Sequence, residues 1–214
     1  MTVICGDASA WRVNLLAIQD VILTLLIPDA WPRCQRICAG KELHEDKVTH
    51  PFIKTLRTSK SSLRHKFEHV KFRIEPFVGV NPGDSNTGFT DIHVIPMYDN
   101  EEIYLAYECK WLEKTEHNLS GFCGKEGIGR FTSGKYAAQV NVGNMIGYVF
   151  SGEIEKAERN ILSYMQKNGL PIPSSVGKNL PNMCVLRSRH QRAVIFGDIE
   201  ITHILLPYIA VQGQ

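Results

Sequence analysis

Three short segments of strand-like sequence, separated by turn sequences, most constrain the fold of this chain. In the first, Val70, Phe72 and Ile74 alternate with charged residues, and a period of two predicts a β-strand. The stretches 89–98 and 103–112 are apolar runs of strand length. Short polar turns join antiparallel neighbours. We therefore expect the three segments to form an antiparallel meander.

Helical patterns lie on both sides of this meander. Residues 41–60 carry an apolar stripe at spacings of three and four, although Pro51 predicts a kink or a helix start within it. The Gly-rich stretch 113–133 predicts a mobile surface loop. The remaining expectations are a helix over 133–143, a strand over 145–150, a helix over 154–165, and strands over 183–190 and 198–208. Helices interleaved with strands predict an α/β or α+β fold.

The N-terminal residues 1–40 are mostly apolar and are broken by Pro28 and Pro32. We expect them to form a helical lead-in to a core domain over 41–214. The stretch 13–27 is too short and too polar to span a bilayer, and it lacks the basic n-region and the clear cleavage site of a secretory signal. A cytoplasmic protein without a membrane partner is the prediction. If the lead-in cannot cover its own apolar face, oligomerisation follows.

The six cysteines form no CxxC pair. Without a secretory signal they are expected to be reduced thiols. Cys34, Cys38 and the nearby His44 hint at zinc, but no second close pair completes a site.

Charge is unevenly distributed in this chain of 214 residues, although its net charge is only +2. Basic residues dominate from Lys54 to Arg73, where Glu68 is the one acid, and acids dominate from Asp91 to Glu116. A basic segment beside an acidic centre suits a protein that binds phosphates and holds a metal. A solvated helix face and loop is the alternative.

The strand over 103–112 carries two charged residues in an otherwise apolar run. Glu108 and Lys110 are two positions apart, so they project from the same face. If the preceding strand pairs with this one, Asp91 approaches Glu108. Two close carboxylates repel unless a cation lies between them, and Mg²⁺ prefers oxygen ligands. The backbone carbonyl of Cys109 adds a further candidate ligand, while an edge-strand ion pair is the alternative interpretation.

Asp91 followed by Glu108-Cys109-Lys110 resembles the PD-(D/E)XK superfamily of restriction-endonuclease-like nucleases. The resemblance covers roughly residues 41–150 and implies a central mixed sheet flanked by helices. It implies that Asp91 and Glu108 bind Mg²⁺, for which Mn²⁺ substitutes, and that Lys110 assists the attacking water. It also implies an assisting carboxylate on a preceding helix, for which Glu45 is the candidate. Thr90 stands where many members have proline.

By the same resemblance, the expected activity is endonucleolytic hydrolysis of DNA. Such domains often serve restriction, anti-phage defence or repair, as homo-oligomers or as one component of a larger complex. Lys135, Tyr136 and Gln139 lie on the segment that matches a DNA-contacting helix of the family.

Three more candidates for nucleic-acid contact come from the residues themselves. Arg64 and Lys66 belong to the basic segment, and Arg189 offers a forked donor set for phosphate. The alternative for the stretch around Arg189 is a polar hairpin turn. His93 and His203 are expected to be structural.

Two other functions remain open. The same fold without turnover would be a nucleic-acid-binding or assembly subunit, with salt-dependent binding through the basic segment. The other open function involves no nucleic acid: the chain would be a protein-interaction domain that docks a partner through its apolar N-terminal helix.

Overall fold

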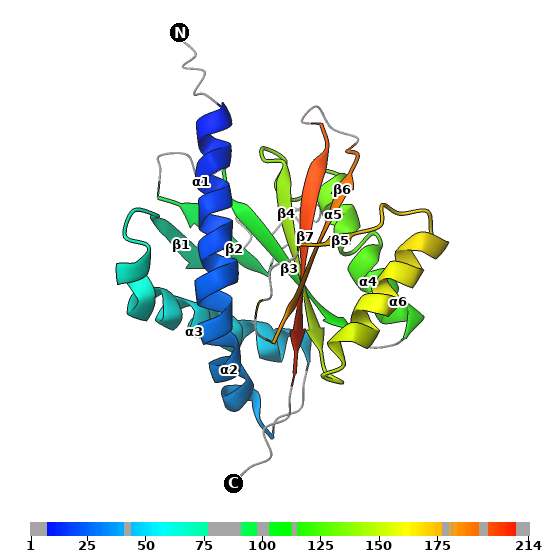
Figure 1. Cartoon of the computed structure of the whole chain (residues 1–214), viewed down its shortest axis with the longest axis horizontal. Coiled ribbons are helices and arrows are strands. Elements are labelled where there is room, and N and C mark those ends of the chain that lie inside the picture. Colours follow the sequence, from blue (N-terminus) through cyan, green and yellow to red (C-terminus); the bar gives the residue numbers. More distant parts are fainter. Residues whose placement is uncertain are drawn as a thin grey trace, which may run out of the picture.

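The computed structural model describes residues 8–40, 44–76, 91–97, 103–112, 115–176, 180, 182–192 and 197–208, with side chains from residue 15 onward. Within these residues, seven strands form one mixed sheet that carries helices on both faces (Figure 1). The protein is therefore of the α+β class, as predicted.

The strands follow the order β1-β2-β3-β4-β7-β6-β5 across the sheet. Their bounds are β1 Phe72–Glu75, β2 Ile92–Pro96, β3 Leu105–Leu112, β4 Val142–Val149, β5 Ser174–Ser175, β6 Cys184–His190 and β7 Ile199–Pro207. β1 pairs antiparallel with β2, and β2 pairs antiparallel with β3, so the predicted antiparallel meander is confirmed. At the centre β3, β4 and β7 run parallel, and β6 and β5 return antiparallel.

The helices form the two outer layers of the fold. Their bounds are α1 Ala8–Val21, the π-helical turn η1 Ile22–Leu26, α2 Ile27–Cys38, α3 Glu45–Leu63, the 3-10 turn η2 Arg64–Lys66, α4 Glu116–Cys123, α5 Ile128–Thr132 and α6 Ile154–Lys167. The predicted helix over 154–165 is thus confirmed as α6. Gly169 follows it with φ +65°, the left-handed conformation that ends helices.

One face of the sheet packs against α1, α2 and α3. Tyr148 of β4 stacks on Trp31 of α2, with ring centroids 5.5 Å apart, and lies edge-on to Phe52 of α3. Gln19 of α1 donates to Asn144 of β4 at 2.6 Å. The N-terminal helices therefore share one hydrophobic core with the sheet.

The opposite face packs against α4, α5 and α6. Phe122 of α4 lies beside His203 of β7, with ring centroids 5.8 Å apart. A Cβ atom added at Gly143 of β4 would lie only 2.5 Å from the ring of Phe131 of α5, so the ring packs directly against the strand backbone. The side chain of Glu108 projects to this face because its register partner Met145 alternates with Asn144, which faces α1.

The N-terminal prolines do not interrupt the helix, contrary to the sequence-based expectation. Helical conformation continues through α1, η1 and α2, with Pro28 in the first turn of α2 and Pro32 within it. Pro28, which has no N–H, directly follows the π-helical turn η1, where the Ile27 N–H bonds to the Ile22 carbonyl five residues back and the regular α-helical hydrogen-bond pattern is already interrupted. The continuous segment Leu15–Cys38 is long and apolar enough to cross a membrane by length and composition, which corrects the expectation that it is too short. Half of its most apolar stretch is buried within the fold, as in a core helix.

Two local expectations about residues 113–143 were wrong. The described part of the predicted loop contains α4 and α5, because apolar residues at spacings of three and four are buried beneath its glycines, namely Leu119, Phe122, Cys123, Ile128 and Phe131. The predicted helix over 133–143 is a series of turns followed by β4. Gly134 and Ala137 adopt φ values of +76° and +52°, which a right-handed helix does not contain.

Candidate functional site

The site lies along the edge of β3, where its neighbour β2 begins. The β2–β3 ladder ends at the pair Ile92–Tyr107, so the next residues of β3 have no β2 partner. The backbone N–H of Cys109 donates to Asp91 Oδ2 at 2.6 Å, and that of Trp111 donates to Glu45 Oε2 at 3.1 Å. Two carboxylates thus take the place of the neighbouring strand.

Asp91 and Glu108 are brought together by strand register. Continuing the ladder one residue past Ile92–Tyr107 places Asp91 opposite Glu108. Because the N–H of Cys109 points to the β2 side, Glu108 lies at a non-hydrogen-bonded position, where facing side chains are closest. The predicted convergence of Asp91 on Glu108 is therefore found in the structure.

Glu108 is a buried carboxylate with two unlike oxygens. Its side chain is 1% exposed, and Oε1 lies 2.7 Å from Lys110 Nζ and 2.9 Å from Arg130 Nη1. Oε2 is also buried and has no hydrogen-bond partner among the described residues. A buried carboxylate oxygen without a partner is costly, and it marks the place where a ligand would complete the site.

Glu45 reaches the same cluster from the first turn of α3. Its Oε1 lies 3.0 Å from Lys110 Nζ while its Oε2 accepts from Trp111. The helix begins at Glu45 after the extended residue His44 and continues through Pro51 without a break. The structure therefore places all four predicted catalytic residues in one cluster, and Lys110 bridges Glu45 and Glu108.

Burial and mutual repulsion perturb the acids of this cluster. Burial, and then the nearby carboxylate of Glu108, raise the pKa of Asp91 to about 7, although the hydrogen bond from Cys109 opposes the shift. Burial also raises the pKa of Glu108, against the effect of Lys110 and Arg130. Burial lowers the pKa of Lys110, but Glu108 and Glu45 outweigh it, so the net shift is upward.

Arg130 is a site residue that sequence reasoning missed. It lies on α5, inside the stretch that the glycines indicated as a loop. Its Nη1 donates to Glu108 and to the hydroxyl of Tyr136, and its Nη2 donates to Glu126 Oε2 at 2.8 Å. The guanidinium also lies over the Tyr136 ring, 5.4 Å from the centroid. The buried pair Ile128 and Phe131, three apart, was the available signal for this short helix.

The residues present fit a small divalent cation. Glu108 Oε2 and the carboxylate of Asp91 offer two oxygens. The carbonyl of Cys109 lies on the same side of β3 as its N–H, which donates to Asp91. Within the described ranges no three His, Cys, Asp or Glu side chains form a complete metal site. Mg²⁺ suits such an incomplete set because it keeps several waters and binds through one or two carboxylates plus substrate phosphate.

The predicted nucleic-acid contacts divide into two groups. Lys135 and Gln139 are exposed on the turns before β4, not on a helix, and Tyr136 is buried against Arg130. Lys135 lies close enough to Glu126 for its charge to lower the pKa of that carboxyl, after the larger effects of Arg130. Tyr136 therefore contacts the cluster through Arg130, and Lys135 lies near Glu126, the other carboxylate that Arg130 contacts.

The other predicted contacts lie elsewhere on the molecule. Arg64 and Lys66 are exposed in η2, at the opposite end of α3 from Glu45. Arg189 is exposed on β6, within a strand and not in a turn, and pairs with Asp198 at 2.9 Å. The structure does not bring these three residues to the carboxylate cluster.

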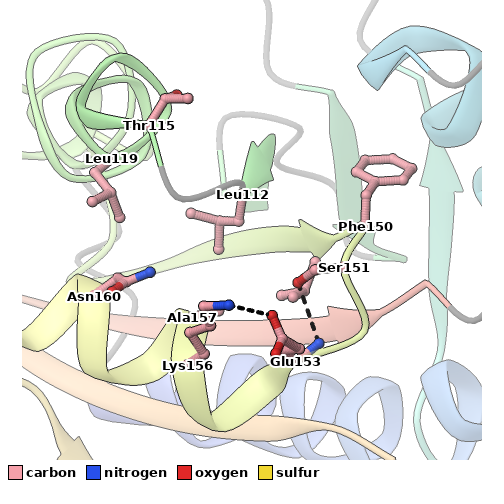
Figure 2. Close-up of a pocket in the computed structure, with 10 residues that line it drawn as sticks. Leu112, Thr115, Leu119, Phe150, Ser151, Glu153, Lys156, Ala157 and Asn160 are labelled. Atoms are coloured by element: carbon pink, nitrogen blue, oxygen red, sulfur yellow. Dashed lines mark hydrogen bonds and ion pairs between the residues drawn. The ribbon is translucent and has the colours of Figure 1, made fainter.

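A pocket of about 370 Å³ lies past the carboxyl ends of β3 and β4, beside α4 and α6 (Figure 2). Leu112 and Phe150 contribute apolar surface, and Lys156 at its rim pairs with Glu153 at 2.6 Å. None of the carboxylates of the cluster lines this pocket. The carboxylate cluster therefore lies outside this pocket.

The cysteine pair of α2 contributes no second site. Cys34 and Cys38 are buried, with their sulfurs directed to the carbonyls of Val48 and Lys47 at 3.6 and 3.8 Å. Both cysteines serve helix packing between α2 and α3.

Comparison of the chain with models of protein families, with curated proteins and with solved structures found no match.

Proposed function

We propose that this protein is a Mg²⁺-dependent endonuclease that hydrolyses DNA phosphodiester bonds on a restriction-endonuclease-like fold. We place it in the cytoplasm, as a component of a restriction or anti-phage defence system. The observation that carries the proposal is the buried Glu108 Oε2, which lacks a partner among the described residues and belongs to the residue that continued strand register places opposite Asp91. A divalent cation between these carboxylates would relieve both the repulsion and the missing contact.

In this proposal, Asp91, Glu108 and the Cys109 carbonyl hold the ion, which would activate water and polarise the phosphate. Lys110 is held by Glu108 and Glu45 at 2.7 and 3.0 Å. Because these carboxylates raise its pKa, the ammonium is suited to donate hydrogen bonds. We assign Lys110 to orienting the attacking water and to stabilising charge that develops on the phosphate. Glu45 fixes the direction of its Nζ.

The test is cleavage of supercoiled plasmid with Mg²⁺ or Mn²⁺ by the wild type and by Lys110→Met and Asp91→Asn. Loss of a positioned group of this kind lowers a rate by roughly 100-fold or more, so both variants should be almost inactive. Lys156→Met is the matched control, because Lys156 pairs with a carboxylate outside the cluster. Wild-type cleavage rates in both folded site variants would overturn the proposal.

A catalytically inactive nucleic-acid-binding subunit on the same fold is the second candidate. One observation favours it: Lys110 and Arg130 both contact Glu108 Oε1 and already offset its charge. This candidate predicts salt-dependent DNA binding without turnover, and no binding of Mn²⁺ in a titration. Mn²⁺ binding that is lost in Glu108→Gln would exclude it.

A further inference from the structure

A second pocket, of about 460 Å³, lies at the end of α3 remote from Glu45, between η2 and β1. In Figure 1 this region is the corner of the fold where α3 meets β1. Three basic residues, Lys60, Arg64 and Lys71, line it together with one acid, Glu68. The pocket wall therefore carries a net charge of +2 when these groups are ionised.

The cations of this pocket lack the compensation found elsewhere on the surface. Within the described ranges, Lys60, Arg64 and Lys71 form no ion pair. In the other large pocket, Lys156 is paired with Glu153 at 2.6 Å. Like charges that line one concave surface repel, and bound anions relieve that repulsion. The charge pattern thus favours an anionic ligand in the pocket between η2 and β1, and not in the pocket lined by Lys156.

The floor of the pocket is apolar and partly aromatic. Phe67 and Phe72 are buried, with ring centroids 5.9 Å apart, and Lys60 Nζ lies 5.2 Å from the centroid of Phe72. Met97 adds a side chain that is 58% exposed. A ligand that fits must combine negative charge with an apolar or planar part, as a nucleotide unit of a polynucleotide does.

We propose that this basic pocket binds a phosphate of the DNA strand beside the cleaved region, with the adjoining sugar or base against Met97. The inference rests on the proposed function, since it names a second contact of the same substrate. The helix α3 spans 19 residues between Glu45 and the pocket, about 28 Å at 1.5 Å per residue. That length corresponds to roughly eight base pairs of duplex. A duplex must therefore extend about that far beyond the cluster to reach the pocket.

The test measures DNA binding without metal, so that it does not depend on cleavage. Fluorescence anisotropy in EDTA would compare the wild type with a variant carrying Lys60→Gln, Arg64→Gln and Lys71→Gln, on labelled duplexes of about 6 and about 24 base pairs. We expect the triple variant to bind the long duplex at least tenfold more weakly, with a salt slope reduced by about one per lost phosphate contact. The wild type should bind the short duplex more weakly than the long one, because a short duplex cannot engage the pocket and the cluster region at the same time.

Two controls keep the result specific. Lys167→Gln removes an exposed lysine that pairs with Glu116 at 3.3 Å outside the pocket, and its effect on binding should be within about twofold. Inorganic phosphate and a mononucleotide, tested as competitors, separate a polynucleotide site from a small-anion site. Melting curves confirm that the triple variant is folded.

The outcomes are decisive for the pocket. Equal binding by the wild type and the triple variant would overturn the inference, and so would the absence of any duplex binding. Competition by mononucleotide at its usual cellular concentration would reassign the pocket to free nucleotides and overturn it as well. Plasmid cleavage that persists unchanged in the triple variant would contradict the role proposed for the pocket, while the role proposed for the carboxylate cluster would still stand.

Discussion

Asp91 lies one residue beyond the Ile92–Tyr107 pair that ends the β2–β3 ladder, where continued register faces it with Glu108, and its Oδ2 accepts the Cys109 N–H at 2.6 Å. The hydrogen bond fixes the aspartate against the strand that carries the glutamate. Two acids are thereby held close together, on β3 and directly before β2, despite their mutual repulsion. A folded protein retains such an arrangement when function requires it or when the surrounding contacts leave no alternative.

Asp91→Asn should stabilise the protein without metal and abolish its response to metal. The substitution removes the repulsion with Glu108 while the amide oxygen still accepts from Cys109. We expect the melting temperature in EDTA to rise by a few degrees. Mn²⁺ at 100 times its dissociation constant should stabilise the wild type by about 2.7 kcal/mol and the variant hardly at all. Thermal unfolding measures both, with Asp198→Asn at an exposed ion pair as the control. A variant stabilised by Mn²⁺ as much as the wild type would contradict the metal assignment.

Arg130→Gln should destabilise the fold more than Glu126→Gln does, although both break a contact of the same guanidinium. The first removes a partner of the buried Glu108, whereas Glu126 is exposed. We expect a loss of about 1–3 kcal/mol for Arg130→Gln and a clearly smaller loss for the exposed partner, because solvent screens that ion pair. Urea denaturation at pH 7.5 compares the two, and equal losses would show that Arg130 does not support Glu108.

Two buried histidines should make the protein lose stability in mild acid. Ser188 Oγ lies 2.7 Å from Nε2 of both His190 and His203, and Phe122 packs beside His203. Burial lowers the pKa of His190 to about 4 and that of His203 to about 3. The unfolded chain takes up these protons first, near pH 6.5, so stability is complete above that pH and declines as the pH falls towards 4.

The expected decline is up to about 1.4 kcal/mol per pH unit for each histidine. Denaturant unfolding between pH 7 and pH 4.5 measures it for the wild type and for His190→Asn with His203→Gln. The double variant should show a shallower pH dependence over that range. An unchanged slope would mean that other groups govern the acid sensitivity.

Gln19→Leu should weaken the attachment of α1 to the sheet. Gln19 is 2% exposed, and its Nε2 donates to Asn144 Oδ1 at 2.6 Å and to Thr202 Oγ1 at 3.1 Å. Replacing it leaves buried acceptors without a donor, at about 1–3 kcal/mol. Thr24→Ala, which removes only a local bond to the Asp20 carbonyl, should stay within about 0.5 kcal/mol. Chemical denaturation of both variants tests this, and equal free energies of unfolding would show that the Gln19 hydrogen bonds to Asn144 and Thr202 do not stabilise the fold.

Helices and strands whose apolar residues recur with a helical or strand period could be predicted from the sequence. The meander, α6, β6 and β7 appear where alternation or a helical stripe indicated them. Residues 113–143 were mispredicted because glycines in α4 and α5 suggested a loop, and because the turn through Ala137 depends on long-range contacts. Local propensity is a weak guide where tertiary packing selects the backbone conformation.

For the cluster, the spacing of Glu108 and Lys110 in an apolar strand already places both on one face of the sheet, because strand periodicity is a local property of the chain. The place of Asp91 followed from assuming that neighbouring strands pair. Glu45 and Arg130 are different: they reach Lys110 and Glu108 from separate helices on opposite sides of the sheet. No local pattern encodes that meeting, because it arises only when both helix layers pack onto the sheet, and packing couples residues that are distant along the chain.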